Sequence, residues 1–579
     1  MRAVWVAAGV VLLAGPAFAA SPPATESDRF MVVSAQRLAA EAGAAVLRQG
    51  GNAIDAAVAV GYAEAVTNPC CGNIGGGGFL VAHLADGRDV FLNFRETAPQ
   101  AASAGMYLDP DGKPVPGASL LGWRSVAVPG SVMGLDTALT RYGTLPRAAV
   151  MAPAIRLARD GFLLSRADTD ILDRGVAKLR GHVRTFLRPD GTPFQPGDRL
   201  MQPDLAATLQ AIAGAGPDAF YHGRIPRAVE AASRAGGGLI TAGDFAAYQV
   251  TEAEPLRCAY RGFTVLSTRP PSSGGTTLCE MLNILGGYDL RAMGFHSAAS
   301  VHVMTETMRH AFLDRNTWLG DPAFVDNPLQ RLLSPDYAAA LRASIGARAT
   351  PSSALQAGVA PHEKPETTHY SVLDGQGNAV AVTFTLNGYF GAGVIAADTG
   401  FLLNDEMDDF TIKPGAPNLF GLVQGAANAI APGKRPLSSM APTIVLHDGR
   451  VALVLGSPGG ARISTIVLET LLNMVEYDMA PQAAVDAPRL HHQWLPDTLF
   501  AEPYALSPDT AALLAGMGYR ITEQTPWGAV ALIAVGSAFA GGGGVASSGQ
   551  DGTAGQGMRP NWFYGANDSR RPAGAAIGE

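Results

Sequence analysis

Apolar and small residues recur at helical spacing along the first half of the chain. The pattern covers residues 35–48 and 53–65, which a Gly-Gly-Asn break separates, and it continues over 130–165 and 203–250. Residues 53–65 are nearly all small and apolar, which is typical of a helix buried on most sides. We therefore expect this half to supply a layer of helices.

The pattern changes to strands in the last third of the chain. Residues 368–372 alternate between apolar and polar, and the turn residues 374–377 separate them from an apolar run over 379–385. A second hairpin is predicted from residues 443–446 and 451–455 around an Asp-Gly turn. Because helices gather in the first half and strands in the last third, the expected fold is α+β, with sheets covered by helices.

Composition indicates a folded chain rather than a disordered or fibrous one. Hydrophobic residues make up 47% of the 579 residues and charged residues only 16%, which argues against disorder and against a coiled coil. The formal net charge is -8, and no stripe of Lys and Arg alternates with aromatic residues. We therefore expect no nucleic-acid partner.

The first residues are typical of a secretory signal peptide. Arg2 precedes an apolar run, and the small-x-small triplet Ala17-Phe18-Ala19 follows it. The alternative is a membrane anchor, but the run is shorter than the roughly 20 apolar residues that a span needs. We expect residues 1–19 to be removed, the protein to be secreted or periplasmic, and no stable membrane span to remain.

The cysteines and histidines do not predict a metal centre. Four cysteines in so long a chain are not a disulfide framework, and the sequence does not assign their pairing. Their spacing matches no zinc motif, and His491-His492 lacks the offset that would place two ligands on one helix face. We expect neither a metal nor a cofactor.

A threonine directly follows a predicted linker. Residues 344–366 are rich in Pro, Ser, Ala and Gly without a clear period, so we expect an exposed segment where a chain can be cut. Cleavage before Thr367 would leave its α-amine beside its own hydroxyl, and that amine can act as the base for the nucleophile. The alternative is that Thr367 is only a β-branched residue at the start of a strand.

The surrounding motifs favour the chemical interpretation, because they resemble the γ-glutamyltranspeptidases (glutathione hydrolases). They run in family order along nearly the whole chain after residue 19. The motifs are Gly50-Gly51-Asn52-Ala53-Ile54-Asp55-Ala56-Ala57, Gly75 to Gly78, Phe94-Arg95-Glu96-Thr97-Ala98-Pro99, Thr367-Thr368-His369-Tyr370-Ser371-Val372, Thr385-Leu386-Asn387, Met407-Asp408-Asp409-Phe410, Lys434 to Met440, Gly456-Ser457-Pro458-Gly459-Gly460, and Asp486 to Arg489 with His491 to Trp494.

This resemblance implies an N-terminal nucleophile hydrolase made as a precursor that cleaves itself between Glu366 and Thr367. The expected products are a large subunit, residues 20–366, and a small subunit, residues 367–579. Both would remain packed as a heterodimer in one four-layer αββα sandwich.

The resemblance also implies roles for the catalytic residues. Thr367 would attack the γ-carbonyl of a γ-glutamyl donor such as glutathione, and the acyl group would pass to water or to an amino-acid or peptide acceptor. The backbone N–H groups of Gly459 and Gly460 would hold the oxyanion, since glycine permits a close approach. Thr385 matches a family threonine that positions the nucleophile.

The glutamyl head of the donor carries one carboxylate and one ammonium, so its site must present both signs. By resemblance, Arg95 would bind the α-carboxylate through its planar guanidinium, together with the hydroxyls of two serines. An acidic group and its neighbours would hold the α-ammonium. The serines are Ser438 and Ser439, and the ammonium site is Asp409 with Glu406 and Asn387.

The sequence departs from the family pattern at two places. Some relatives have a tyrosine in the lid-like loop where this chain has Phe420, so the choice of acceptor and the access of water are open. The Gly/Ser-rich stretch 536–557 has the composition of an insertion between the last two strands, and we expect a mobile surface loop without a catalytic role.

Two rival functions remain at this point. An acylase for glutaryl-type amides, including cephalosporin side chains, would use the same fold on a substrate that lacks the α-ammonium, and the carboxylate of Asp409 argues for the γ-glutamyl donor. A periplasmic solute-binding protein would share the signal peptide and the acidic charge. It would need neither Thr367 after a cleavable linker nor the Gly459-Gly460 pair.

Overall fold

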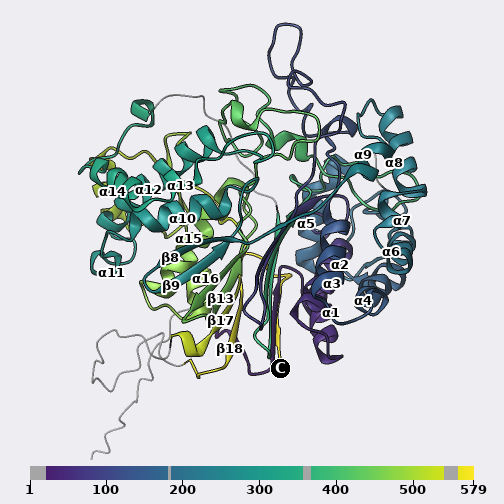
Figure 1. The fold of residues 1–579 in the computed structure, drawn as a ribbon, viewed down its shortest axis with the longest axis horizontal. Helices are drawn as coiled ribbons and strands as arrows, with labels where there is room; N and C mark the ends of the chain where they lie inside the picture. The colour runs from purple at the N-terminus through teal and green to yellow at the C-terminus, as the bar shows by residue number, and fades with distance from the viewer. Residues whose placement is uncertain (1–20, 180–183, 356–366, 540–557) are drawn as a thin grey trace, which may run out of the picture.

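The computed structural model describes residues 21–179, 184–355, 367–539 and 558–579. Two seven-stranded sheets lie face to face in the middle of the molecule, and helices cover both outer faces (Figure 1). Every neighbouring pair of strands in these two sheets is antiparallel. The predicted αββα sandwich is confirmed.

The first sheet has the order β1 (Thr25–Ser27), β18 (Phe563–Asn567), β17 (Ala531–Val535), β13 (Arg450–Gly456), β12 (Thr443–His447), β9 (Phe263–Ser267) and β8 (Leu256–Tyr260). The second has the order β19 (Ala575–Gly578), β2 (Phe30–Ser34), β10 (Thr368–Asp374), β11 (Ala379–Thr385), β3 (Gly77–His83), β4 (Asp89–Phe94) and β7 (Thr251–Ala253). Two small sheets lie outside the sandwich: β14 (Leu490–His491), β15 (Leu499–Ala501) and β16 (Ile521–Glu523), and β5 (Phe162–Leu163) with β6 (Arg199–Leu200).

The helices form two outer groups (Figure 1). One group is α1 (Arg37–Arg48), α2 (Ala53–Thr67), α3 (Ser131–Tyr142), α4 (Arg147–Asp160), α5 (Arg166–Leu179), α6 (Pro203–Ala215), α7 (Asp218–Tyr221), α8 (Arg224–Ala235) and α9 (Ala242–Ala247). The other is α10 (Gly274–Leu285), α11 (Leu290–Met293), α12 (Ala298–Trp318), α13 (Leu329–Leu332), α14 (Pro335–Ser344), α15 (Ile463–Val475), α16 (Pro481–Asp486) and α17 (Pro508–Met517).

Alternation along the strands explains why the second sheet is buried on both faces. In β10, Val372 packs into the core shared with α1 and α2, while its neighbour Leu373 packs into the core between the sheets. The same alternation places Val380 and Ala381 of β11 on opposite sides. Because successive side chains point to opposite faces, a strand with two covered faces has a continuous apolar run, as this sequence does.

The local predictions are confirmed at both hairpins and at the first two helices. Strand β10 pairs with β11, and β12 pairs with β13. Helix α2 is buried along its whole length, and Asn52 and Asp55 form a capping box at its start. The expected separation of helices and strands along the chain is wrong, because β2, β3 and β4 come from the first part and α10 to α15 lie between later strands.

The described part of the segment before Thr367 is exposed or half-buried, as expected, except at Ser352. Residues 352–355 form a short 3-10 helix, and the Ser352 side chain is fully buried. Its hydroxyl donates to the carbonyl of Trp494 at 2.5 Å, and its amide donates to Asp497 at 2.7 Å. The linker prediction is therefore wrong at this point, while residues 356–366, including Glu366, lie outside the described residues.

Three further expectations can be placed on the fold. The stretch 536–557 follows β17 and precedes β18, and β19 is the last strand, so it does not separate the last two strands. Its start forms a 3-10 helix, Gly536–Ala538, and residues 540–557 lie outside the described residues, as do residues 1–20. Cys258 in β8 forms a disulfide with Cys279 in α10, and Cys70 forms one with Cys71.

Among the residues that the structure describes, no helix has the length and apolar character needed to cross a bilayer. The same described part of the chain contains no group of His, Cys, Asp and Glu side chains arranged to hold a metal ion.

Candidate active site

Thr367 lies directly before β10, in the middle of the second sheet. In the adjacent pair Thr368 is opposite Phe384, so the next position in the register places Thr367 opposite Thr385. Both threonines are buried and line one narrow cavity of about 20 Å³. The predicted nucleophile and the threonine predicted to position it therefore meet across neighbouring strands.

This cavity, called here the nucleophile cavity, contains nearly every residue predicted for the site. Gly459 is not in its lining, and Glu366 lies outside the described residues. The lining residues are Arg95, Arg315, Thr367, Thr385, Asn387, Glu406, Asp409, Phe420, Leu422, Ser438, Ser439, Met440, Gly460 and Ile463.

Arg95 brings charge into the nucleophile cavity from the end of β4. Its side chain is fully buried and forms ion pairs with Glu406 and Asp409, both in the 3-10 helix Glu406–Asp409. Its Nε donates to the carbonyl of Pro436 at 3.2 Å. The cation predicted for the donor carboxylate is thus paired here with the two carboxylates predicted for the donor ammonium.

Burial controls the protonation of this cluster. It raises the pKa of Glu406 and of Asp409, although the charge of Arg95 opposes both shifts. Burial also raises the pKa of Glu96 to about 7, and Glu96 contacts Arg95 at 3.5 Å. Burial lowers the pKa of Arg95, but the carboxylates outweigh it and hold that pKa above its ordinary value. The three carboxyl groups around this guanidinium are therefore protonated more readily than free carboxyl groups.

The residue Asn387 links the end of strand β11 to the start of the 3-10 helix Glu406–Asp409. Asn387 has a left-handed backbone with φ of 72°, and its amide donates to the Thr385 hydroxyl at 2.8 Å. Its side chain donates to the carbonyl of Asp405 at 3.0 Å. On the other side, a Cβ at Gly76 would lie 1.9 Å from the Thr385 carbonyl, so only glycine fits at this point of the Gly75 to Gly78 run.

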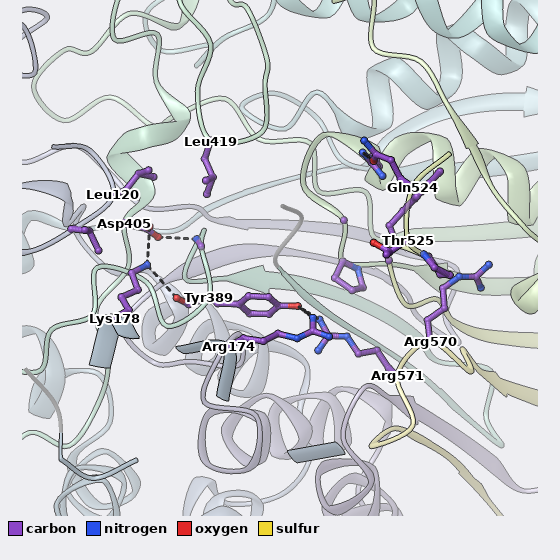
Figure 2. A pocket seen from close by; sticks show the side chains of 18 of the residues that line it. Leu120, Arg174, Lys178, Tyr389, Asp405, Leu419, Gln524, Thr525, Arg570 and Arg571 are labelled. Atoms are coloured by element: carbon purple, nitrogen blue, oxygen red, sulfur yellow. Dashed lines mark hydrogen bonds and ion pairs between the residues drawn. The ribbon is translucent and has the colours of Figure 1, made fainter. Parts of the chain in front are cut away.

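The two glycines predicted for the oxyanion lie at the start of a helical segment. Gly460 begins the 3-10 helix Gly460–Arg462, which leads directly into α15, and it lines the nucleophile cavity. Free N–H groups at such a helix start favour a developing negative charge. Gly459 lines a second cavity of about 840 Å³, called here the cationic bay (Figure 2).

Phe420 closes the nucleophile cavity, as a lid residue would. It is buried with 4% of its surface exposed, in a small cluster with Phe312 and Trp494. A Cβ at Gly460 would lie 2.5 Å from the Phe420 ring, so the ring rests on this glycine. Gln493 donates to the Phe420 carbonyl at 3.2 Å, which holds the lid backbone.

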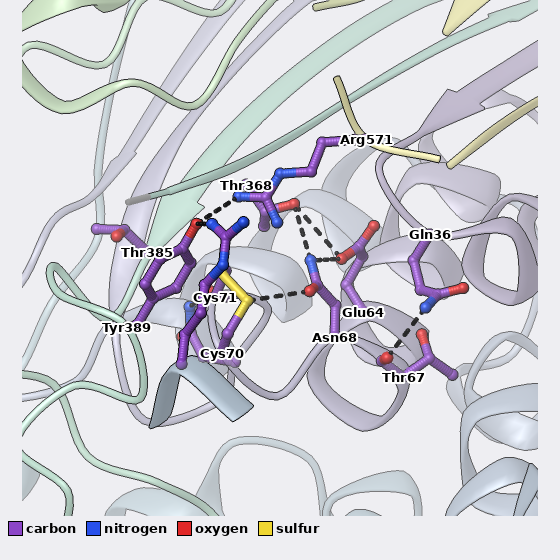
Figure 3. The surroundings of a disulfide bond; sticks show 12 residues. Gln36, Glu64, Thr67, Asn68, Cys70, Cys71, Thr368, Thr385, Tyr389 and Arg571 are labelled. Atoms are coloured by element: carbon purple, nitrogen blue, oxygen red, sulfur yellow. Dashed lines mark hydrogen bonds between the residues drawn. A yellow bond between two sulfur atoms is a disulfide. The ribbon is translucent and has the colours of Figure 1, made fainter. Parts of the chain in front are cut away.

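A buried polar network lies behind the nucleophile strand (Figure 3). The carboxyl of Glu64 in α2 accepts hydrogen bonds from Ser34, from Asn68 at 2.7 Å and from Thr368 at 3.4 Å. Glu64 is fully buried, and burial raises its pKa to about 7. The residue next to the nucleophile is therefore held by a carboxyl that titrates near neutral pH.

Comparison with known proteins agrees with this arrangement. The model of the family Gamma-glutamyltranspeptidase matches residues 39–572. The chain belongs to this family. It is 51% identical over 564 residues, 97% of this chain and 96% of the relative, to a protein named Glutathione hydrolase proenzyme of Pseudomonas sp. (strain A14).

The same family includes proteins named for another activity. The chain is 40% identical over 510 residues, 87% of this chain and 88% of the relative, to Acylase ACY 1 proenzyme of Pseudomonas sp. (strain V22). The crystal structure of a cephalosporin acylase from Bacillus halodurans superposes with a TM-score of 0.81 over 99% of both chains. At 24% sequence identity, that likeness supports the fold alone.

Sequence reasoning missed four residues that line the nucleophile cavity: the apolar Leu422, Met440 and Ile463, and the charged Arg315 of α12. Its side chain is buried, with Nη2 donating to the Ser439 hydroxyl at 3.1 Å and Nε to the Ser273 hydroxyl at 3.0 Å. Burial lowers its pKa to about 10, which still leaves it charged at neutral pH. It stands in a long helix without a motif around it, so only its contacts reveal it.

Proposed function

We propose that this chain is a γ-glutamyltransferase and glutathione hydrolase that matures from a single-chain precursor. The observation that carries the proposal is that Thr367 shares one buried cavity with Arg95, Glu406 and Asp409. A nucleophile beside groups of both signs suits a donor with an α-carboxylate and an α-ammonium. The name and similarity of the Glutathione hydrolase proenzyme relative support the same activity.

Maturation begins with attack of the Thr367 hydroxyl on the carbonyl of Glu366. The peptide C–N bond breaks, an ester forms, and water then hydrolyses the ester to release the Glu366 carboxylate and the Thr367 amine. The products are residues 20–366 and 367–579, which stay paired as large and small subunits. Because β10 lies between β2 of the large subunit and β11 of the small one, the two chains share a sheet and remain bound after cleavage.

In the mature site the Thr367 amine takes the proton of its own hydroxyl as the oxygen attacks the γ-carbonyl. The N–H groups of Gly459 and Gly460 stabilise the oxyanion, and Thr385 orients the nucleophile. Collapse of the tetrahedral species expels the amine, which receives the proton. Water or the amine of an amino acid or peptide then attacks the acyl-enzyme and restores Thr367.

Donor binding exchanges internal ion pairs for pairs with the substrate. The donor carboxylate binds Arg95 with Ser438 and Ser439, and the ammonium binds Asp409 with Glu406 and Asn387. Arg95 already contacts both carboxylates, so each charge that the donor contributes replaces a protein charge of the same sign. Because the donor head has no net charge, this exchange leaves the net charge of the buried cluster unchanged, which lowers the cost of taking the donor out of water.

Residues 1–19 are an export signal in this proposal, and the mature protein works in the periplasm or outside the cell. The first experiment is the denatured intact mass of the purified exported protein, followed by turnover of glutathione. Two species of about 36 and 22 kDa are expected, from the mean residue mass of a 59.9 kDa chain of 579 residues. A single species that nonetheless turns over glutathione would contradict the mechanism.

The acylase relative supports a second candidate, the hydrolysis of glutaryl-type amides. That substrate lacks an ammonium, so Asp409 and Glu406 would have no partner in it. A comparison of γ-glutamyl and glutaryl donors with the same leaving group separates the two candidates. We expect the γ-glutamyl donor to be the better substrate, and the opposite order would favour the acylase.

A further inference from the structure

The cationic bay and the nucleophile cavity lie on two sides of the same backbone segments. Gly388, Leu419 and Gly459 line the bay, and their next neighbours in sequence, Asn387, Phe420 and Gly460, line the nucleophile cavity. Along each of these three segments, the lining of the bay and the lining of the nucleophile cavity are therefore one residue apart. Its volume of about 840 Å³ is large enough for a peptide fragment.

Most charged groups of the cationic bay already have partners. Lys178 pairs with Asp405 at 3.5 Å, and Arg570 pairs with Glu502 and with Asp568 at 3.1 Å. Among the described residues that line the bay, Asp405 is the only acidic one, and it is buried beside the half-buried Lys178. These ion pairs fix the side chains in the walls of the bay, so Lys178 and Arg570 have little remaining capacity to bind a ligand.

Two arginines of the bay have a different environment (Figure 2). Arg174 of α5 and Arg571, close to the C-terminus, both donate to the hydroxyl of Tyr389, at 3.3 and 3.1 Å. Their guanidinium carbons lie 5.8 and 5.9 Å from the centre of the same ring. Among the described residues, neither arginine forms an ion pair with a carboxylate, although the positive charge of Arg571 also acts on the buried carboxyl of Glu64.

Two positive charges that meet at a neutral phenol repel each other, and an anion between them would remove this cost. A guanidinium binds a carboxylate through two parallel N–H donors, so a pair of arginines suits a carboxylate well. The Tyr389 hydroxyl receives bonds from both and can donate its own proton to the same anion. The arrangement is a preformed site for one carboxylate.

The chemistry of the donor indicates which carboxylate binds at this site. When glutathione is the donor, the group expelled from the γ-carbonyl is a dipeptide that ends in a free carboxylate. An extended dipeptide reaches about 7 Å from the scissile bond, at roughly 3.3 to 3.6 Å per residue. A peptide acceptor approaches the same carbonyl from the same side and carries the same terminal group.

We propose that the cationic bay binds the amine-side peptide, and that Arg174, Arg571 and Tyr389 recognise its terminal carboxylate. This inference rests on the proposed function, because it identifies the part of the substrate that the nucleophile cavity does not hold. The three residues act as a specificity site for carboxylate-bearing leaving groups and acceptors.

The test compares donors that differ only in the charge of the leaving group. Glutathione, its C-terminal carboxamide and γ-glutamyl-p-nitroanilide are assayed with the mature wild-type enzyme, Arg571→Gln and Arg174→Gln. Each substitution is expected to lower kcat/KM for glutathione at least tenfold, mainly through KM, because a charge-assisted hydrogen bond is lost. Turnover of the carboxamide and the anilide should change less than about twofold.

Two further variants sharpen this test. Arg571→Lys keeps the positive charge and should restore part of the affinity for glutathione, which a purely structural role of Arg571 would not predict. Arg227→Gln removes an exposed arginine of α8 and should leave all three donors unchanged.

Equal losses for glutathione and the anilide would overturn the proposal, and so would unchanged kinetics for glutathione. These failures differ from a failure of the proposed function. If the proposed function itself were wrong, the wild-type protein would turn over none of the three donors.

Discussion

The nucleophile cavity and the cationic bay differ in whether their charged side chains are paired. In the nucleophile cavity Arg95 is completely buried and contacts Glu406 and Asp409, in a space of about 20 Å³. In the bay, with about 840 Å³, Arg174 and Arg571 share only a tyrosine hydroxyl between them. One region is closed and has its charges paired before the substrate arrives, whereas the other is open and has an excess of positive charge.

This difference separates the tasks of the two regions. A ligand that replaces both signs costs the buried charge cluster the least, so we expect donor recognition to be strict. An open site with exposed cations attracts many carboxylates, each with a modest and salt-dependent gain. We expect the enzyme to select one donor head and to accept a wide range of peptides on the amine side.

The largest effect is expected when the nucleophile is removed. Thr367→Ala should abolish both maturation and turnover, with a loss of at least about 10⁴-fold in kcat, because no other hydroxyl in the cavity would have its own α-amine as a base. Intact mass should give one species instead of two. Thr367→Ser, which keeps a hydroxyl, should still mature, and a mature and active Thr367→Ala protein would remove the basis for the assigned cavity.

The next effect concerns folding stability and pH. The pKa of Glu64 is about 7 in the folded chain, against an ordinary value near 4.5, so the folded state holds this proton more tightly. The resulting stabilisation is complete below about pH 4.5 and disappears as the pH rises to about 7, for a total of about 3 kcal/mol at 1.36 kcal/mol per pKa unit.

Glu64→Gln should remove this pH dependence. The test uses denaturant unfolding between pH 5 and 8 in the Thr367→Ala background, which stays a single chain. Asp408, whose pKa burial also raises to about 7, contributes in the same range, so the readout is the difference between proteins with and without the Glu64 change. Parallel pH curves for the two proteins would contradict the network behind the nucleophile.

A smaller effect is expected from the ammonium site of the nucleophile cavity. Asp409→Asn should lower kcat/KM for γ-glutamyl-p-nitroanilide tenfold or more, because the donor ammonium loses a charged partner worth about 1.5 to 3 kcal/mol. The matched control is Asp408→Asn, since the Asp408 carboxyl accepts bonds from Ser119 and the Leu419 amide and does not line the cavity. Similar losses in both variants would argue against a direct contact between Asp409 and the donor.

The smallest effect is expected from salt. Raising the ionic strength from about 0.05 to 0.5 M shortens the screening length from over 10 Å to under 5 Å. KM for glutathione should rise about twofold to threefold, since its carboxylate binds in the open bay, and KM for the neutral glutathione carboxamide should rise less. An equal rise for both donors would place the salt effect in the nucleophile cavity.

Much of the nucleophile cavity could be predicted from sequence because its residues stand in short motifs at the ends of regular elements. Thr367 precedes a strand that its alternation and turn residues reveal, and Gly460 lies in a glycine pair after another strand. Arg315 could not be predicted in this way. It enters the site from the middle of a helix, and its contacts with Ser273 and Ser439 exist only after three distant segments pack together.

The sequence by itself determined the hairpins and the buried helix α2, and it was enough to predict the candidate nucleophile and the acidic and glycine motifs, because each depends on local periodicity or on a motif. Only the tertiary structure decided that Cys258 pairs with Cys279, that Ser352 is buried, and that Arg174 and Arg571 converge on Tyr389. Each of these features depends on which distant segments become neighbours when the two sheets and their helices pack. No local pattern along the chain predicts which segments those are.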